Sequence, residues 1–308
     1  MGRRANSIWL SAIGDAWGRW TEMVDFESIP EHVPMTDPMT ITDDTQMALA
    51  VLHGIDDAMT TDHRYIDHIS ERFIEWLYDK DNNRGPGRTC LTALRSLDEA
   101  RRNGKDRTPW VGTVEDSKGC GANMRAPWIG LLSIMSLEEL ETLGVGQAFI
   151  THGHDTALDA TRLTVHGTFL LANHHIPPGS LVEHLTIGTN QEILSALDRA
   201  QSIEPSQMWE KTFDPCSIVG GGWVAEDALA LAARIADVYH DNPKEGLHRA
   251  VRTGGDSDSI ACITGSFLGA GWDGNWRELF PDVVFEPRYQ QELTWATGMV
   301  DSIKPMEN

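Results

Sequence analysis

The spacing of the apolar residues constrains the fold of this chain more than any other feature. In Met47–Gly54 and again in Ala228–Ile235, apolar side chains recur every three or four positions, the period of an α-helix that buries one face. Runs that alternate apolar and polar residues, as a half-buried β-strand does, are scarce. The pattern therefore predicts an all-α fold.

Short segments rich in Gly, Pro and Asn separate the helical stretches and predict loops. They are Pro30–Pro38, Asp79–Gly87, Asn103–Gly121, Pro177–Gly179 and Gly220–Gly222. No repeat with a period of about 20 to 50 residues is present, and no shift of composition marks a linker. Because 41% of the 308 residues are hydrophobic, the chain can bury a large core. We expect a single helical domain over residues 1–308.

The charge of the chain argues against nucleic acid as a partner. Asp and Glu number 46 against 25 Lys and Arg, for a formal net charge of −21. Such a surface repels a phosphate backbone, so direct binding to bulk DNA or RNA is not expected. Divalent cations would be attracted instead, although acidic surfaces are common and this points to no single partner.

The cysteines and the N-terminal segment bear on the cellular compartment. The four cysteines are far apart and form no CxxC pair: Cys90, Cys120, Cys216 and Cys262. This excludes a zinc knuckle and a dense disulfide framework, and predicts a reducing cytoplasm. The apolar stretch Ile8–Ile13 is interrupted by Asp15, too early for a secretory leader or a membrane span. We expect a cytoplasmic protein without a membrane partner, whose first helix begins near the N-terminus.

Two acidic motifs stand at predicted helix starts. Thr42-Asp43-Asp44-Thr45 precedes the helical run that begins at Gln46, so its carboxylates fall beside free backbone N–H groups. An ordinary N-cap is the alternative function for this motif. Much later, Gly254-Gly255-Asp256-Ser257-Asp258-Ser259 leads into a second helical run, and its glycines allow a tight turn.

Four carboxylates brought together would repel one another unless a cation compensates them. With the hydroxyl groups of Thr42 and Ser259 they form an all-oxygen ligand set. Such a set suits magnesium, manganese or calcium, and does not suit copper or zinc.

A rival calcium site is rejected on its sequence. Asp79–Arg84 begins like an EF-hand loop, but Arg84 replaces the required Gly and Cys90 stands in place of the terminal Glu.

Two further segments carry weaker signals. Gly119–Arg125 resembles a dinucleotide-binding loop, but Met124 replaces the last Gly and no strand precedes it. Its small residues would let a phosphate approach a helix starting around Ala122, or they form only a tight turn. The histidines of Thr151–Asp155 and the pair His174-His175 lack a Cys or Glu at zinc spacing, so structural roles are expected.

Taken in order, these motifs resemble those of the ADP-ribosylglycohydrolase family, over about Gly14 to Gly269. The matching segments are Gly14-Asp15-Ala16-Trp17-Gly18 followed by Glu22, Thr42–Thr45, Gly87-Arg88-Thr89, Gly119–Arg125, Thr151-His152 and Gly254–Ser259. The two Asp motifs are the most specific part of the resemblance.

The resemblance implies an all-α, orthogonal multi-helix bundle with a binuclear magnesium site, in which manganese is also accepted. The positions that match the family's metal ligands are Thr42, Asp43, Asp44, Asp256, Asp258 and Ser259. As a hypothesis, Asp258 or Asp44 accepts the proton of the attacking water. Glu22 matches a mobile acidic residue used for proton transfer or gating, and a solvated surface Glu is the alternative.

The resemblance also implies a binding site for ADP-ribose. Its diphosphate would lie over the backbone of Gly119, Gly121, Ala122, Asn123 and Met124, and His152 belongs to the matching Thr-His motif. Trp17, Trp110 and Trp128 are candidates for stacking on adenine, although a place in the core is expected for each.

The implied activity is hydrolysis of the bond that links ADP-ribose to a modified protein side chain, with arginine favoured because acidic residues would hold its guanidinium. Serine-linked or other ADP-ribose conjugates remain the alternative substrates. A catalytically silent protein that binds an ADP-ribosylating toxin is the alternative outside enzymology, and complete metal motifs argue against it. Departures at Gly153-His154-Asp155 and Arg252-Thr253 leave the choice of substrate open.

Overall fold

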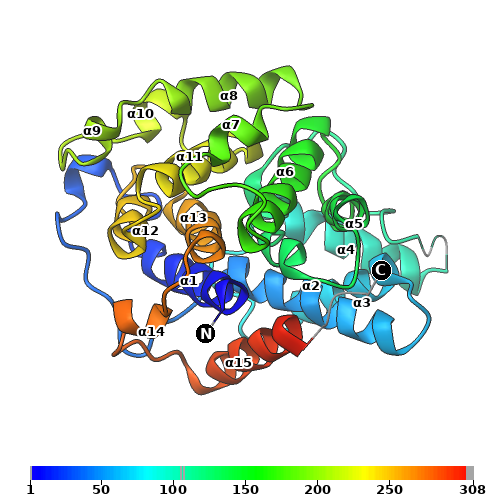
Figure 1. The fold of residues 1–308 in the computed structure, drawn as a ribbon. Helices are drawn as coiled ribbons and strands as arrows, with labels where there is room; N and C mark the ends of the chain where they lie inside the picture. Colours follow the sequence, from blue (N-terminus) through cyan, green and yellow to red (C-terminus); the bar gives the residue numbers. More distant parts are fainter. Residues whose placement is uncertain (1, 105, 107, 303–308) are drawn as a thin grey trace.

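Two helices from opposite ends of the sequence form the centre of the fold (Figure 1). The computed structural model describes residues 2–104, 106 and 108–302. Helix α1 (Arg3–Gly18) packs along the length of α13 (Ser257–Gly271). Ala5–Gly18 of α1 and every residue of α13 are buried, so this pair is the core of the bundle.

The other helices surround this pair. Helices α6, α11 and α12 pack on α13, α2 pairs with α3, α5 pairs with α6, and α15 lies against α1 and α2. Their bounds are α2 (Asp43–Thr60), α3 (Tyr65–Leu77), α4 (Arg88–Arg102), α5 (Leu137–Phe149), α6 (Asp155–Ala172), α7 (Leu181–Leu185), α8 (Gln191–Gln201), α9 (Pro205–Met208), α10 (Cys216–Val219), α11 (Ala225–Val238), α12 (Pro243–Val251), α14 (Trp276–Leu279) and α15 (Pro287–Ser302), with 3₁₀ turns η1 (Phe26–Ser28), η2 (Cys120–Ala122) and η3 (Pro127–Leu131).

The all-α prediction is confirmed. Among the described residues, β-structure is limited to isolated bridges such as Gly119 with Val224. The stretches with helical spacing form α2 and α11, and the predicted loops lie outside the α-helices, apart from residues 105 and 107 of Asn103–Gly121, which are outside the described residues. Helix α2 begins at Asp43, three residues before the predicted start at Gln46, because the Thr42 hydroxyl caps it by accepting the N–H of Asp44 at 3.3 Å.

The C-terminal end of α1 meets the N-terminal end of α13 at Gly18. A Cβ atom at Gly18 would lie 2.5 Å from the carbonyl oxygen of Ser257, a distance that only glycine avoids. The Ser257 hydroxyl donates to the Gly18 carbonyl at 2.9 Å, and the Thr21 hydroxyl lies 2.9 Å from Ser257 Oγ. This contact brings the turn after α1, which carries Glu22, to the start of α13.

Two other sequence features have a structural outcome. The four cysteines are free thiols. No helix in the described part of the chain combines the length and the apolarity that crossing a membrane requires.

Candidate active site

Asp15 organises the first acidic motif from within α1. Its carboxylate is fully buried and accepts the backbone N–H and the hydroxyl of Thr42, at 3.0 and 2.7 Å, and the N–H of Thr45 at 3.1 Å. The Thr45 hydroxyl also donates to it. Burial raises the pKa of Asp15, and the donors from Thr42 and Thr45 oppose this rise. Asp15 therefore fixes the start of α2 against α1.

The loop before α4 supports Asp43 from the other side. The N–H of Gly87 donates to Asp43 Oδ2 at 3.2 Å, and the N–H of Asp43 donates to the carbonyl of Arg84 at 3.1 Å. Because helix α4 begins at Arg88, the Gly-rich loop identified in the sequence lies directly beside the first acidic motif.

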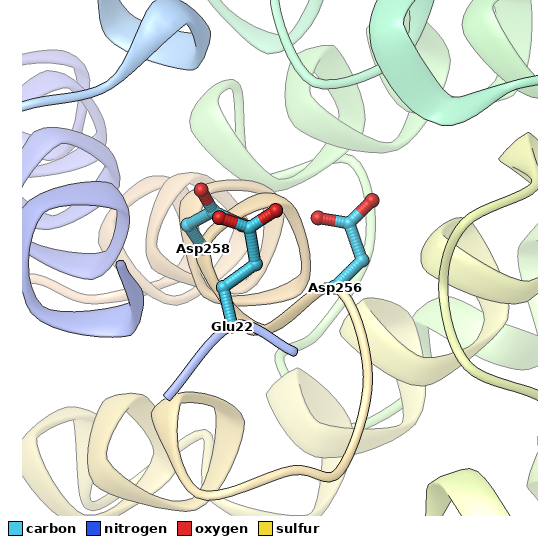
Figure 2. Close-up of side chains that lie close together, drawn as sticks. All are labelled: Glu22, Asp256 and Asp258. Carbon is cyan, nitrogen blue, oxygen red and sulfur yellow. The ribbon is translucent and has the colours of Figure 1, made fainter. Parts of the chain in front are cut away.

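The second acidic motif lies at the start of α13. The Asp256 N–H donates to the carbonyl of Gly221 at 2.8 Å, and the Ser259 N–H donates to Asp258 Oδ1 at 3.0 Å. Figure 2 shows the carboxylates of Asp256 and Asp258 with that of Glu22, which reaches them from a separate segment. In the described part of the chain, these three residues form a group in which one oxygen from each lies within 4.8 Å of the other two.

Glu22 has an unusual acidity in this position. It is half-buried, and burial, followed by the charges of Asp256 and Asp15, raises its pKa to about 7. The alternative of an ordinary solvated glutamate is therefore not what the structure shows. A carboxyl group with this pKa can hold a proton near neutral pH and also release it.

The two acidic motifs come close enough to interact. Burial and then the charge of Asp44 raise the pKa of Asp258 well above its usual value. Burial and then the charges of Asp15, Asp43 and Asp256 do the same for Asp44. Asp43 is raised likewise, first by burial. Such a set of buried carboxylates is stable only if protons or cations neutralise it.

One carboxylate oxygen of the cluster lacks a hydrogen-bond partner. Asp44 is 2% exposed, and its Oδ1 is buried without any hydrogen-bond partner. A buried, unpaired carboxylate oxygen costs several kcal/mol, of the order given by desolvation of an ion. The nearby atoms that could bind an ion are carboxylate and hydroxyl oxygens, so the residues present fit a hard divalent ion.

A thiol group lies in the same cluster, which the sequence did not indicate. Cys120 donates its S–H to Asp256 Oδ2 at 2.8 Å and has its sulfur 3.6 Å from Ser259 Oγ. The oxygen ligand set predicted from the sequence did not anticipate this neighbouring sulfur. The cause is a contact between residues more than 130 positions apart, for which the spacing of the cysteines gave no signal.

Arg125 holds the Gly-rich segment that precedes it. Its guanidinium is fully buried and donates to the carbonyl of Gly121 at 3.0 Å, to Gln147 Oε1 at 2.6 Å and to Thr151 Oγ1 at 2.8 Å. It also lies over the ring of Phe73 at 4.5 Å. A Cβ atom at Gly121 would lie 3.2 Å from the His152 ring, so the segment packs tightly on the Thr-His motif.

The predicted helix start at Ala122 is wrong, because only the 3₁₀ turn Cys120–Ala122 forms there. The N–H groups of Asn123 and Met124 both donate to the carbonyl of Cys120, at 2.7 and 3.0 Å. These two donors are therefore not available to a phosphate. Both side chains are buried, and the Met124 sulfur accepts the Ser259 hydroxyl at 3.7 Å.

The histidines His152 and His154 make hydrogen bonds within the fold. His152 is buried, and its Nδ1 lies 2.8 Å from Thr151 Oγ1. Burial, with the charge of Arg125, lowers the pKa of His152 to about 3, so the ring is neutral. His154 caps α6 by accepting the N–H of Thr156. Neither histidine belongs to the metal-competent group found among the described residues.

Two further expectations can be compared with the structure. Trp17 and Trp128 are in the core as expected, but Trp110 is 46% exposed, so its expected core position is wrong. Asp79 and Asp81 of the rejected EF-hand segment bind Arg288, at 2.6 and 2.9 Å, which neutralises the carboxylates that a calcium ion would need.

Comparison with known proteins gives three results. A family model described as ADP-ribosylglycohydrolase matches residues 2–287. The chain is 27% identical over 275 residues to the ADP-ribosyl-[dinitrogen reductase] glycohydrolase of Rhodospirillum rubrum, covering 84% of this chain and 82% of that protein. A solved structure described as an ADP-ribosylglycohydrolase-related protein complex matches with a TM-score of 0.65 and 22% identity over 98% of each chain, a likeness of fold.

Proposed function

Because the chain belongs to the ADP-ribosylglycohydrolase family and is a hydrolase of glycosidic bonds, we propose that it removes ADP-ribose from modified arginine side chains of a protein in a metal-dependent reaction. The observation that carries the metal dependence is the buried, unpaired Oδ1 of Asp44 within a cluster of carboxylates. The choice of arginine as the modified residue rests on the acidic charge of the protein.

The ligands proposed for two magnesium ions, with manganese as a substitute, are the oxygens of Thr42, Asp43, Asp44, Asp256, Asp258 and Ser259. Asp15 and Gly87 orient the first acidic motif through the hydrogen bonds described above, as outer partners of metal ligands do. When bound, such ions orient the ribose hydroxyls and make a water molecule more acidic.

The protein's own carboxyl groups supply the proton transfers. Cleavage at the anomeric carbon of ribose passes through an oxocarbenium-like state and needs an acid for the leaving group and a base for the water. We assign the acid to Glu22, whose pKa of about 7 lets it carry a proton at neutral pH. The base is Asp258, or Asp44 from the opposite side of the cluster.

The diphosphate of ADP-ribose is proposed to lie along η2. Gly119, Gly121 and Ala122 provide the backbone donors, since those of Asn123 and Met124 are used within the turn. The buried side chains of Asn123, Met124 and His152 are proposed to support this segment by packing against it. Asn123 Nδ2, for example, donates to the carbonyl of Ala225 at 3.4 Å.

An arginine-linked substrate fits the charge of the protein. A guanidinium group is cationic and binds carboxylates through paired hydrogen bonds, and the net charge of −21 attracts it. The relative from Rhodospirillum rubrum is named for a modified protein, dinitrogen reductase. A serine linkage presents the same ribose to the cluster and is the competing substrate.

The test compares two peptides, one with ADP-ribosyl-arginine and one with ADP-ribosyl-serine, each with magnesium or with EDTA, and follows free ADP-ribose by mass spectrometry. Magnesium-dependent release from the arginine peptide alone is expected. Release from the serine peptide alone would overturn the linkage, and equal release with EDTA would overturn the metal dependence. Asp258→Ala should abolish release while retaining helical circular dichroism.

A further inference from the structure

One short loop contacts both halves of the proposed site. This glycine loop, residues 220–224, lies between α10 and α11. The carbonyl of Gly221 accepts the N–H of Asp256, a proposed metal ligand, at 2.8 Å. The carbonyl of Trp223 accepts the N–H of Cys120, the first residue of η2, at 3.1 Å. The glycine loop therefore touches the second acidic motif and also the segment proposed to bind the diphosphate.

The glycine loop packs on the second acidic motif without room for a side chain. A Cβ atom at Gly255 would overlap the carbonyl of Gly221, and one at Gly222 would lie 3.4 Å from the Cβ of Asp256. Backbone meets backbone at this contact, and close-packed interiors transmit a displacement to the atoms they touch. A shift of the glycine loop would therefore move Asp256.

The end of the glycine loop is bonded to the segment before η2. Gly119 forms an antiparallel bridge with Val224. The bridge consists of the bond from Cys120 and a second bond, in which the N–H of Ala225 donates to the carbonyl of Lys118 at 2.9 Å. These bonds fix the place of η2 relative to the glycine loop, so both halves of the proposed site depend on where this loop lies.

Arg199 on α8 supports the start of the glycine loop. Its Nε and Nη2 both donate to the carbonyl of Val219, at 3.0 and 2.8 Å, and Nη2 also donates to Asp227 Oδ1 at 3.0 Å. The Asp227 carboxylate fills the space beside Gly220, where a Cβ atom would overlap it. Burial and the charge of Glu226 raise the pKa of Asp227, and Arg199 opposes this rise. The ion pair therefore fixes the loop at Val219 and Gly220.

We propose that Arg199 and Asp227 are positioning residues for the hydrolysis, acting through the glycine loop on Asp256 and on η2 together. Neither side chain is among the proposed metal ligands or diphosphate donors. The inference rests on the proposed places of magnesium and of the diphosphate. Its distinctive consequence is that loss of one ion pair weakens both binding functions at once, although the pair touches neither ligand.

The first measurement needs no ligand. Amide hydrogen exchange of the full-length, metal-free protein is followed by mass spectrometry in peptides that contain Cys120 and Asp256. In Arg199→Ala both amides should exchange about tenfold faster, the scale set by the loss of one hydrogen bond to a charged group. A residue that serves only global stability would speed exchange throughout the core instead.

The second measurement follows the two ligands separately. Magnesium affinity is obtained from the rise in melting temperature without nucleotide, and ADP-ribose affinity from calorimetry in EDTA. Both should fall about tenfold in Arg199→Ala, the lower end of what outer partners of metal ligands contribute. Arg199→Lys, which lacks the planar group that reaches Val219 and Asp227 together, should lie between Arg199→Ala and the wild type.

Two further variants serve as controls. Arg162 also donates to a backbone carbonyl, that of Gly188 at 3.3 Å, and to a carboxylate, that of Asp159 at 2.9 Å. Because Gly188 lies in a loop that carries none of the proposed site residues, Arg162→Ala should leave both amides and both affinities unchanged. If the pair acts as a unit, Arg199→Ala combined with Asp227→Asn should be no weaker than Arg199→Ala alone.

Three results would overturn the proposal: unchanged exchange at both amides in folded Arg199→Ala, loss of only one of the two affinities, or equal losses in Arg162→Ala. If Arg199→Ala does not fold, Arg199→Lys decides by the same measurements. A wild type that binds neither magnesium nor ADP-ribose would contradict the proposed function instead, and the exchange of the two amides would still decide whether the ion pair positions the loop.

Discussion

Asp15 Oδ1 accepts two hydrogen bonds from Thr42, from its backbone N–H at 3.0 Å and from its hydroxyl at 2.7 Å. The same carboxylate accepts two more from Thr45. A residue that is not itself among the proposed metal ligands thereby fixes the direction of the motif that contains three of them.

Replacing Asp15 should damage both stability and metal binding. Asp15→Ala leaves buried donors of Thr42 and Thr45 without an acceptor, and we expect the free energy of unfolding to fall by about 3 kcal/mol. The rise in melting temperature caused by magnesium should also shrink. Asp15→Asn, which keeps one acceptor oxygen, should lie between the wild type and Asp15→Ala in chemical denaturation. Equal stability of Asp15→Ala and wild type would contradict this role.

Removing one charge from the cluster should separate stability from function. Burial and the charges of Asp15, Asp43 and Asp256 raise the pKa of Asp44, which means that its charged form destabilises the fold. Asp44→Asn should therefore raise the melting temperature of the metal-free protein. The same variant should lose most of the stabilisation by magnesium and the release of ADP-ribose. A lower melting temperature in EDTA would show that the repulsion is not the dominant effect.

The metal-free protein should lose stability as pH rises. Glu22 has a folded pKa of about 7, above its usual 4.5, so its contribution is present below about pH 4.5 and is lost as pH rises through about 7. Burial also raises the pKa values of Asp43, Asp44 and Asp258, so these carboxyl groups contribute to the loss in the same direction.

Magnesium should remove much of this dependence, so the increase in melting temperature on adding magnesium should grow between about pH 6 and about pH 8. Comparing samples with magnesium and with EDTA cancels the opposite contribution of His152, whose pKa is lowered. An increase that is constant over this range would contradict the coupling.

Helix α15 should influence the metal centre from a distance. Arg288, at its start, binds Asp79 and Asp81, in the loop whose Gly87 N–H reaches Asp43. Arg288→Ala should weaken magnesium binding several-fold, while stability changes by about 1 kcal/mol or less because the ion pairs are partly exposed. The matched control is Arg102→Ala, which removes the exposed pair with Asp98 and should leave magnesium affinity unchanged.

The buried guanidinium of Arg125 should not tolerate lysine. Lysine cannot bind Gly121, Gln147 and Thr151 together as the planar group does. Arg125→Lys should reduce the free energy of unfolding by about 2 kcal/mol and raise the KM for an ADP-ribosylated peptide more than it lowers kcat. An unchanged KM in a folded variant would argue against a positioning role for the η2 segment.

The sequence predicted what local patterns determine. Helical spacing gave the all-α fold, and the two Asp motifs at helix starts indicated the residues that the structure brings together. Contacts between distant segments were not predictable, because neither periodicity nor spacing encodes them. The thiol of Cys120 beside Asp256 is one example.

The role of Asp15 had a signal that could have been used. It is a carboxylate between the apolar residues Ile13 and Trp17 of α1, and a charge at such a position is seldom buried without partners. In the sequence Asp15 served to exclude a secretory leader and as part of a matching segment, but it was given no role at the site. The helix start at Ala122 failed for another reason, because the turn Cys120–Ala122 uses the carbonyl of Cys120 to hold two N–H groups and the chain then reaches Pro127.

The pairing of α1 with α13 sets an order of events during synthesis. One half of the acidic cluster is made first, on residues 15–44, and the other half, on residues 256–259, follows more than 200 residues later. Until then the apolar faces of α1 have no partner, and Asp15 and Asp44 have no opposing motif. A nascent chain that ends before α13 therefore cannot assemble the cluster.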